Sequence, residues 1–362
     1  MDIIKKRKRL GILTSGGDCP GLNAVIRAVV NHGISTYDWE VLGIPYATRG
    51  LLERKAIPLS RHGLDLRGID PLLNMGGTIL GSINKGNTLD RIDEIVASYQ
   101  DLQLDALIGI GGDGSLAILN KLRTAGNWQF IAIPKTIDND VALTDRVVGF
   151  DTAVNTIVDA LYRLTFTAAS HDRIMIVEVM GRSAGHLALH SGIAGGADVI
   201  LIPEIPYTIA GVCEHLAELR DKWGRRFAIA VVAEGVKVAE DSSLYPSCQT
   251  PSCGIGQYIA EEIRNCSHNE LDIRVSVLGH IQRGGIPTAL DRLVATAFGK
   301  TAVDLIAAGE TGKMVAWKNG QVEAVSLDAV LLESPLHVAA NSSLVETARA
   351  LGIYIGNGAI TS

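Results

Sequence analysis

The chain has 362 residues, which is long for one hydrophobic core and predicts two domains. Its net charge of −6 argues against general nucleic-acid binding, because contact with phosphate backbones needs an excess of Lys and Arg. Aromatic residues make up 5% of the chain, so Ile, Val, Leu and Ala must fill the interior, as in parallel-sheet α/β proteins.

Neither a signal peptide nor a membrane span is visible, because no long apolar segment follows the basic run at residues 5–9. The five cysteines lack the spacing of a disulfide framework. We therefore expect a cytoplasmic protein that binds neither membranes nor nucleic acids. Cys248 and Cys253 share a Ser/Pro-rich loop, where a redox role is one alternative to ordinary surface thiols.

Short apolar runs alternate with helical patterns along the chain. The expected strands are residues 10–14, 106–110, 130–134, 174–179, 227–233 and 273–278. The expected helices are residues 23–32 and 115–122, a small-residue helix after Ser183, and residues 290–308. This alternation predicts parallel sheets with right-handed crossovers. Residues 318–321 are typical of a hairpin turn, which predicts a small antiparallel element near the C-terminus.

Four segments rich in Gly and Asp directly follow expected strands or lie at their ends. They are residues 14–18, 111–115, 136–140 and 279–285. Ligands of parallel α/β sheets bind at the carboxyl ends of strands, so these loops predict one site. Glycines let a backbone approach anionic oxygens, and carboxylates can hold magnesium or accept a hydroxyl proton. The combination predicts phosphoryl transfer.

The first segment offers the backbone N–H groups of Gly16 and Gly17 to a nucleotide phosphate, although a tight strand–helix turn would look the same. It is neither a P-loop nor the dinucleotide fingerprint. The second segment contains Gly112, Asp113, Gly114 and Ser115. An aspartate between glycines suits magnesium, and NAD and lipid kinases share this pattern.

The third segment places Asp138 and Asp140 two residues apart, so one can accept the proton of an attacking hydroxyl while the other helps to position magnesium. Thr136 is placed to contact phosphate, and an Asx-rich turn is the simpler alternative. Several further polar residues are candidates for binding a sugar phosphate, although surface ion pairs are the commoner fate of arginine. These candidates are Arg173, Arg182, Glu234, Arg274, His280 and Arg283.

Six segments, taken in order, resemble the 6-phosphofructokinase family from about Leu10 to Gly299. They are residues 14–18, 76–82, 111–115, 134–140, 177–181 and 279–285. The resemblance implies two Rossmann-like three-layer α/β/α domains with mainly parallel sheets and an active site in the cleft between them. Residues 1–149 plus about 282–332 would form the nucleotide-binding domain, and residues 150–281 plus about 333–362 the sugar-phosphate-binding domain.

The activity implied by the resemblance is glycolytic transfer of a phosphoryl group from Mg-ATP to the 1-hydroxyl of fructose 6-phosphate. Asp138 would be the general base, Asp113 would belong to the magnesium site, and Asp140 would support the catalytic loop. Thr136 and Arg182 would stabilise the transferring group. The sugar phosphate would contact Met180, Gly181, Glu234, His280 and Arg283 of one subunit and Arg173 and Arg274 of a neighbour. The resemblance thus implies a homotetramer with shared sites and allosteric control.

The family divides by phosphoryl donor. Gly114 resembles the ATP-using members, because an aspartate there would repel the α-phosphate of ATP. Lys135 resembles the pyrophosphate users. Familiar bacterial members carry a donor-binding arginine where this chain has Asn84, and the following Lys85 is the expected substitute, as a point charge without the arginine's fork. We expect ATP as donor, with a pyrophosphate-dependent phosphotransferase as the alternative and a non-catalytic sugar-phosphate sensor as the second. Of the arginines in the bacterial effector site, Arg27 and Arg61 are matched, whereas Asn31 and Thr165 replace others.

Overall fold

The computed structural model describes residues 7–61, 70–82, 88–239, 241–242, 254–268 and 270–356. The chain divides into two compact units. The first contains residues 1–152 and 283–335, and the second contains residues 153–282 and 336–362. None of the described helices is both long and apolar enough to cross a membrane.

The first unit is built on a seven-stranded sheet in the order β11-β10-β5-β4-β1-β2-β3. Its strands are β1 (Arg9–Thr14), β2 (Glu40–Gly43), β3 (Ile57–Leu59), β4 (Ala106–Gly111), β5 (Phe130–Pro134), β10 (Lys313–Lys318) and β11 (Gln321–Ser326). The five strands from β10 to β2 are parallel, and β3 and β11 close the two edges as antiparallel partners. The strand order reverses at β1, because the chain turns from β2 on one side of it to β4 on the other.

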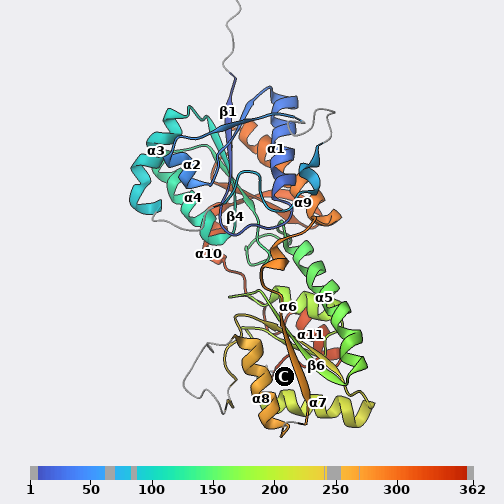
Figure 1. The fold of residues 1–362 in the computed structure, drawn as a ribbon. Coiled ribbons are helices and arrows are strands. Elements are labelled where there is room, and N and C mark those ends of the chain that lie inside the picture. The colour runs from blue at the N-terminus through green and yellow to red at the C-terminus, as the bar shows by residue number, and fades with distance from the viewer. Residues whose placement is uncertain are drawn as a thin grey trace, which may run out of the picture. The chain divides into compact units, whose positions relative to one another are not determined.

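Helices cover both faces of this sheet (Figure 1). They are α1 (Leu22–Tyr37), α2 (Thr48–Leu52), α3 (Ile92–Asp101), α4 (Asp113–Gly126), α9 (Ala289–Ala307) and α10 (Leu327–Glu333), with 3₁₀ turns at Pro71–Asn74 and Thr88–Arg91. α1 and α9 pack together on one face, at a point where only glycine fits: a Cβ on Gly299 would lie 2.7 Å from the Cβ of Ala28. Helices α2, α3, α4 and α10 lie on the opposite face.

The second unit has a four-stranded, wholly parallel sheet in the order β7-β8-β6-β9. Its strands are β6 (Arg173–Val179), β7 (Val199–Leu201), β8 (Ala228–Ala233) and β9 (Asp272–Val277). Its helices are α5 (Phe150–Ser170, which begins in the first unit), α6 (His186–Ala194), α7 (Ile209–Trp223), α8 (Ile255–Cys266) and α11 (Ser343–Ala350), and the 3₁₀ turn Gly279–Arg283 follows β9. Right-handed crossovers put α7 and α8 on one face and α6 on the other.

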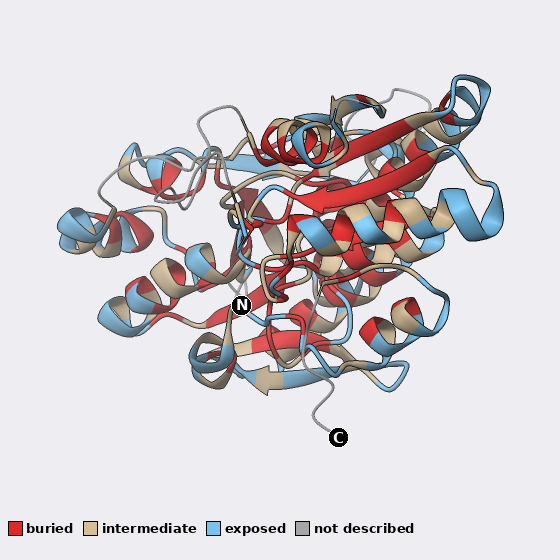
Figure 2. Ribbon diagram, turned by 90° about the horizontal axis from the view of Figure 1, so that it is seen from below, coloured by how far each residue is buried: buried red, intermediate tan, exposed pale blue. Residues whose placement is uncertain are grey.

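Central strands are the most deeply buried parts of both units (Figure 2). Every residue of β4, β5 and β8 is buried. This burial follows from their sequences, which are nearly continuous runs of Ile, Val, Leu and Ala, because a parallel strand covered on both faces needs apolar side chains on both. The parallel α/β architecture predicted from the alternation of strands and helices is therefore confirmed.

For the strands and helices that were predicted, most boundaries agree with the structure to within one or two residues. The helix predicted at residues 23–32 is longer, because α1 continues through the buried Gly33 and ends where Asp38 takes a left-handed conformation. The predicted hairpin is confirmed: Asn319 and Gly320 both have positive φ between β10 and β11, as a two-residue turn requires. The short strands β2, β3 and β7 were not predicted, since three or four residues carry little periodic signal. Seven of the described helices were also absent from the prediction, namely α2, α3, α5, α7, α8, α10 and α11.

Candidate active site

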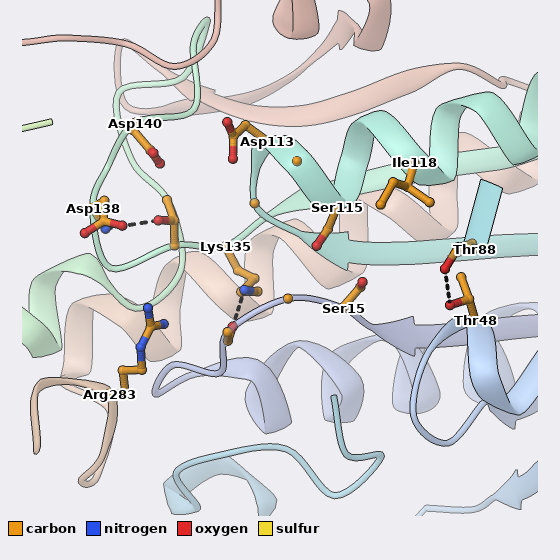
Figure 3. Close-up of a pocket in the computed structure, with 15 residues that line it drawn as sticks. Ser15, Thr48, Thr88, Asp113, Ser115, Ile118, Lys135, Asp138, Asp140 and Arg283 are labelled. Carbon is orange, nitrogen blue, oxygen red and sulfur yellow. Dashed lines mark hydrogen bonds between the residues drawn. The ribbon is translucent and has the colours of Figure 1, made fainter. Parts of the chain in front are cut away.

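A cavity of about 390 Å³ opens in the first unit where β1, β4 and β5 end (Figure 3). The strand order reverses between β1 and β4, and such points are the usual ligand sites of open parallel sheets. Three of the four segments singled out in the sequence line this cavity, namely 14–18, 111–115 and 136–140, and Arg283 of the fourth joins them. The structure thus brings the donor-side candidates of the first unit together.

The segment at residues 76–82 forms hydrogen bonds with the end of β1 and with the loop that follows it. The Thr14 hydroxyl donates to the carbonyl oxygen of Gly81 at 2.8 Å, and the Ser82 hydroxyl donates to the carbonyl oxygen of Gly16. Gly16 has φ of 85°, a conformation in which a side chain is strained. These contacts explain why two glycine-containing segments, distant in sequence, are needed to shape one wall of the cavity.

The loop after β4 leads directly into α4, a 14-residue helix that begins at Asp113. Gly112 is the N-cap, and the open N-terminal end of the helix lines the cavity, which favours a negatively charged ligand. A Cβ added to Gly114 would meet no atom within 4 Å. Glycine at this position therefore leaves open space in the cavity rather than relieving a clash.

The loop after β5 carries the paired aspartates. Ile137 anchors it, with 1% of its surface exposed, and Asn139 turns the chain with φ of 52°, a left-handed conformation that Asn tolerates well. The backbone N–H of Asp138 donates to the Thr136 hydroxyl at 3.0 Å. As a result both Asp138 and Asp140 line the cavity, and Figure 3 shows Asp113 at the same end.

Lys135 lies beneath this carboxylate end and is 4% exposed. Its ammonium donates a hydrogen bond to the carbonyl oxygen of Gly17, so it ties the loop after β5 to the loop after β1 (Figure 3). Burial lowers the pKa of Lys135, and the nearby Arg283 guanidinium adds to this effect. The lysine is therefore part of the floor of the cavity as well as a positive charge next to it.

Arg283 packs directly on the glycine loop. Its Nη1 donates to the carbonyl oxygen of Asp18 at 3.1 Å. A Cβ on Gly17 would lie 2.4 Å from that same nitrogen. Glycine at position 17 therefore allows the Arg283 guanidinium to pack against the loop. The positive charge lines the cavity on the same side as Asp138 (Figure 3).

The opposite end of the cavity is less charged. Thr48 and Thr88 share a hydrogen bond of 3.2 Å between their hydroxyl oxygens, and Ile118 projects from α4 beside them (Figure 3). Thr88 and Ile118 were not predicted as site residues. Ile118 could have been found from its place one helical turn after Gly114, whereas Thr88 carries no local signal.

The second unit gathers four of the other predicted residues on two loops at the carboxyl edge of its own sheet. Gly181 follows β6 with φ of 124°, and its carbonyl accepts from the backbone N–H of Gly235 at 3.1 Å. A Cβ on Gly235 would lie 1.9 Å from the carbonyl oxygen of Arg182, so the loops after β6 and β8 lie against each other. They place Met180, Gly181, Arg182 and Glu234 side by side, with the side chains of Arg182 and Glu234 exposed.

The turn after β9 joins these two loops, because the backbone N–H of Met180 donates to the Gln282 side chain at 3.2 Å. His280 is exposed on this turn. Arg173 and Arg274 lie elsewhere: both form ion pairs with Asp272, Arg173 at 2.7 Å, and Arg173 stands at the amino end of β6. Within one chain the structure does not bring these two arginines to the loops that carry Arg182 and Glu234.

The donor set suits a magnesium ion. Among the residues that the structure describes, no group of three or more His, Cys, Asp and Glu side chains could hold a metal alone. Two cavity carboxylates, Asp113 and Asp140, match the way Mg²⁺ is usually bound, by one or two carboxylates together with substrate phosphates. Lys85, a predicted donor-binding residue, and Cys248 and Cys253 fall outside the described residues.

Comparisons with known proteins agree with this geometry. Residues 9–306 match the protein family described as Phosphofructokinase. The chain is 72% identical over 353 residues to the ATP-dependent 6-phosphofructokinase 2 of Nostoc sp., covering 97% of this chain and 99% of that protein. It is 64% identical to the ATP-dependent 6-phosphofructokinase of Thermosynechococcus vestitus, covering 97% of this chain and 94% of that one.

Solved structures of the same architecture extend the comparison. Phosphofructokinase from Pichia pastoris matches with a TM-score of 0.80 and 29% identity, over 97% of this chain, and this chain spans 37% of that longer one. A pyrophosphate-dependent phosphofructokinase from Nitrosospira multiformis matches with a TM-score of 0.81 at 22% identity, covering 96% of this chain and 92% of that one, which shows a shared fold.

A doubly wound parallel sheet, glycine loops at the strand ends and clustered carboxylates define an α/β enzyme of the phosphotransferase class. The match over residues 9–306 and the high identity over nearly the whole chain identify it further. The chain belongs to the phosphofructokinase family.

Proposed function

We propose that this protein transfers a phosphoryl group from ATP to the 1-hydroxyl of fructose 6-phosphate, giving fructose 1,6-bisphosphate and ADP. The observation that carries the proposal is the cavity of the first unit, in which Asp138 lies at the same end as Asp113 and Asp140. The names of relatives at 72% and 64% identity, which are ATP-dependent 6-phosphofructokinases, support it.

The first unit binds the donor. The N-terminal end of α4 and the N–H groups of Gly16, Gly17 and Ser115 surround the phosphates, and Thr48, Thr88 and Ile118 at the far end leave room for the nucleoside. Asp113 and Asp140 would hold Mg²⁺, which would supply positive charge to neutralise the phosphates. The open space beside Gly114 leaves the α-phosphate unopposed, which supports ATP as the donor.

The chain's own residues account for the movement of the proton. The Asp138 carboxylate accepts the proton of the sugar 1-hydroxyl, whose oxygen then attacks the terminal phosphorus as ADP leaves. The Thr136 hydroxyl accepts the N–H of Asp138 and thereby fixes the loop that presents this carboxylate. The positive charges of Arg283 and of Arg182 offset the negative charge that develops on the transferring group.

The second unit binds the sugar phosphate. Glu234 and His280 accept and donate hydrogen bonds to the sugar, with Met180, Gly181 and Arg182 beside them. Asp272 forms ion pairs with both Arg173 and Arg274. These two arginines contact the 6-phosphate of the sugar that is bound to a neighbouring subunit, which explains why they lie apart from the other candidates within one chain. This arrangement requires an oligomer, and we propose a homotetramer with shared sites.

Lys135 does not favour pyrophosphate as the donor. Its hydrogen bond to the carbonyl oxygen of Gly17 gives it a structural role that is independent of the donor. The pyrophosphate-dependent neighbour shares 22% identity with this chain, which supports the fold and no more.

The proposal is tested by incubating the protein with ATP, MgCl₂ and fructose 6-phosphate and identifying the products by ³¹P NMR. We expect ADP and fructose 1,6-bisphosphate in equal amounts. ATP hydrolysis without a new sugar phosphate would contradict the acceptor. Tight binding of fructose 6-phosphate without any turnover would instead indicate a sugar-phosphate sensor.

A further inference from the structure

Two cysteines of the second unit lie at the contact between neighbouring helices. Cys213 is in the second turn of α7, and Cys266 is the last residue of α8. The two helices pack against each other on the same face of the four-stranded sheet (Figure 1). Both cysteines line one cavity of about 520 Å³, near the amino ends of β6 and β8, away from the loops that carry Arg182 and Glu234.

The two thiols belong to one cavity and differ in how far they are exposed. Burial and a hydrogen-bonding interaction with the Cys266 thiol raise the pKa of Cys213. Cys213 is half-buried, whereas Cys266 is exposed. A small molecule can therefore reach Cys266 directly, and Cys213 lines the same cavity as the second sulfur.

The third cysteine of the described residues is arranged quite differently. Cys19 lies in the first unit, is fully buried, and donates its S–H to the carbonyl oxygen of Val148 at 3.3 Å. Burial raises its pKa to about 12. Such a thiol behaves as a small apolar side chain, and it provides an internal reference of low reactivity.

The surroundings of the pair favour thiol chemistry over metal binding. The part of the chain that the structure describes holds no group of three His, Cys, Asp or Glu side chains arranged for a metal. The same cavity is lined by the guanidinium groups of Arg220 and Arg226, whose ion-pair partners Asp221 and Asp172 lie at 2.7 Å and 3.3 Å. Positive charge in this cavity disfavours a bound metal cation, which leaves disulfide exchange as the chemistry open to the two thiols.

We propose that Cys213 and Cys266 form a reversible disulfide that joins α7 to α8. The oxidant is glutathione disulfide. The Cys266 thiolate attacks one sulfur of glutathione disulfide, the S–S bond of glutathione disulfide breaks, and one glutathione thiolate leaves. The Cys213 thiolate, having lost its proton to water, then attacks the Cys266 sulfur and releases the second glutathione. The protein loses two protons and two electrons, and the oxidant is reduced to two thiols.

The disulfide would fix α8, which contacts the strand leading to the proposed sugar-phosphate site of the second unit. In the first turn of α8, the backbone N–H of Gly256 donates to the Glu178 carboxylate at 2.8 Å, and Glu178 lies two residues before Met180 on β6. A disulfide at the other end of α8 closes a long loop, and long loops give the larger stabilisation. We therefore expect the oxidised protein to unfold at a higher temperature than the reduced protein.

The test uses the full chain with Cys248→Ser and Cys253→Ser, which removes the two cysteines outside the described residues. The protein is equilibrated with glutathione and glutathione disulfide, quenched with acid, alkylated, digested and mapped by mass spectrometry. We expect a linked peptide containing Cys213 and Cys266, its loss on adding dithiothreitol, and an oxidised form whose Tm is higher by roughly 5 °C. Cys19 should be alkylated only after unfolding.

Single substitutions added to the Cys248→Ser, Cys253→Ser protein distinguish a disulfide between Cys213 and Cys266 from glutathione attachment at the exposed Cys266 alone. Cys213→Ser should accumulate a glutathione adduct at Cys266, because the second thiol is missing. Cys266→Ser changes an exposed position and should leave Cys213 as a thiol. The proposal is overturned if Cys266 carries the adduct while Cys213 is present and unlinked, or if the linked peptide does not form at any glutathione ratio.

Discussion

The ammonium group of Lys135 donates a hydrogen bond to the backbone carbonyl oxygen of Gly17 and so joins the loops that follow β5 and β1. Both loops line the cavity that we assign to the phosphoryl donor. The sequence marks Lys135 as a residue that pyrophosphate-using relatives would carry, but its position makes it a buried support for the glycine loop. Four predictions test the residues around this contact, and a fifth tests the donor itself.

The first prediction concerns the pH dependence of stability. Burial lowers the pKa of folded Lys135 below its value of 10.5 in the unfolded chain. Between these two values the unfolded chain binds the proton and the folded protein does not, so the free energy of unfolding gains a contribution that rises with pH. Each unit of pKa shift is worth about 1.4 kcal/mol.

The measurement compares the wild type with Lys135→Met by urea unfolding at several pH values between 7 and 10. Stability of the wild type relative to the variant should increase as the pH rises. Lys55→Met, at an exposed position, serves as the control and should show no such trend. A constant difference between the wild type and Lys135→Met over this range would contradict the buried environment of the lysine.

The second prediction concerns Gly114. Because a Cβ there meets no atom within 4 Å and the position lies in the first turn of α4, Gly114→Asp should fold at least as stably as the wild type. Its carboxylate would nevertheless repel the phosphates of ATP, and we expect the KM for ATP to rise by about tenfold or more. Gly114→Ala adds no charge and should change the KM for ATP much less. Equal effects of the two substitutions would argue against a phosphate at this place.

The third prediction concerns Asp138. Asp138→Asn keeps the shape of the side chain but removes the proton acceptor, so kcat should fall by roughly 10²–10⁴-fold. Thermal unfolding should be nearly unchanged, and so should the affinity for ATP measured by calorimetry. Asp93→Asn, on the exposed surface of α3, is the matched control and should retain full activity. A kcat for Asp138→Asn within threefold of the wild type would rule out this carboxylate as the base.

The fourth prediction concerns the contact between Gly17 and Arg283. Alanine at position 17 would place a Cβ 2.4 Å from Arg283 Nη1, so the guanidinium must move and lose its hydrogen bond to the Asp18 carbonyl. Because Arg283 offsets charge on the transferring group in the proposed mechanism, we expect Gly17→Ala and Arg283→Ala to lower kcat to a similar extent. The double variant should be little worse than either single one, because both remove the same contact. Additive effects would show that the glycine acts independently of the arginine.

Much of the donor site could be predicted from local sequence. Glycine and aspartate directly after an apolar strand are visible in the chain, and parallel strands must present such loops at one edge. Gly16, Asp113 and Asp138 follow from this pattern, and all three line the cavity.

What the sequence could not predict depends on packing between distant segments. Thr88 reaches the cavity by a hydrogen bond to Thr48, forty residues earlier in the chain. The burial of Lys135 depends on a carbonyl oxygen in another loop, and the pairing of Arg173 and Arg274 with Asp272 depends on the register of β6 and β9. None of these contacts has a periodic or compositional signature, so only the folded chain reveals them.

The central claim is that ATP is the phosphoryl donor for fructose 6-phosphate, and rival-donor kinetics test it most directly. Initial rates are measured with saturating fructose 6-phosphate and MgCl₂ while either ATP or pyrophosphate is varied. We predict that kcat/KM for ATP exceeds that for pyrophosphate by at least about 10²-fold, equivalent to about 2.7 kcal/mol of transition-state stabilisation. Efficient turnover with pyrophosphate and none with ATP would contradict the account.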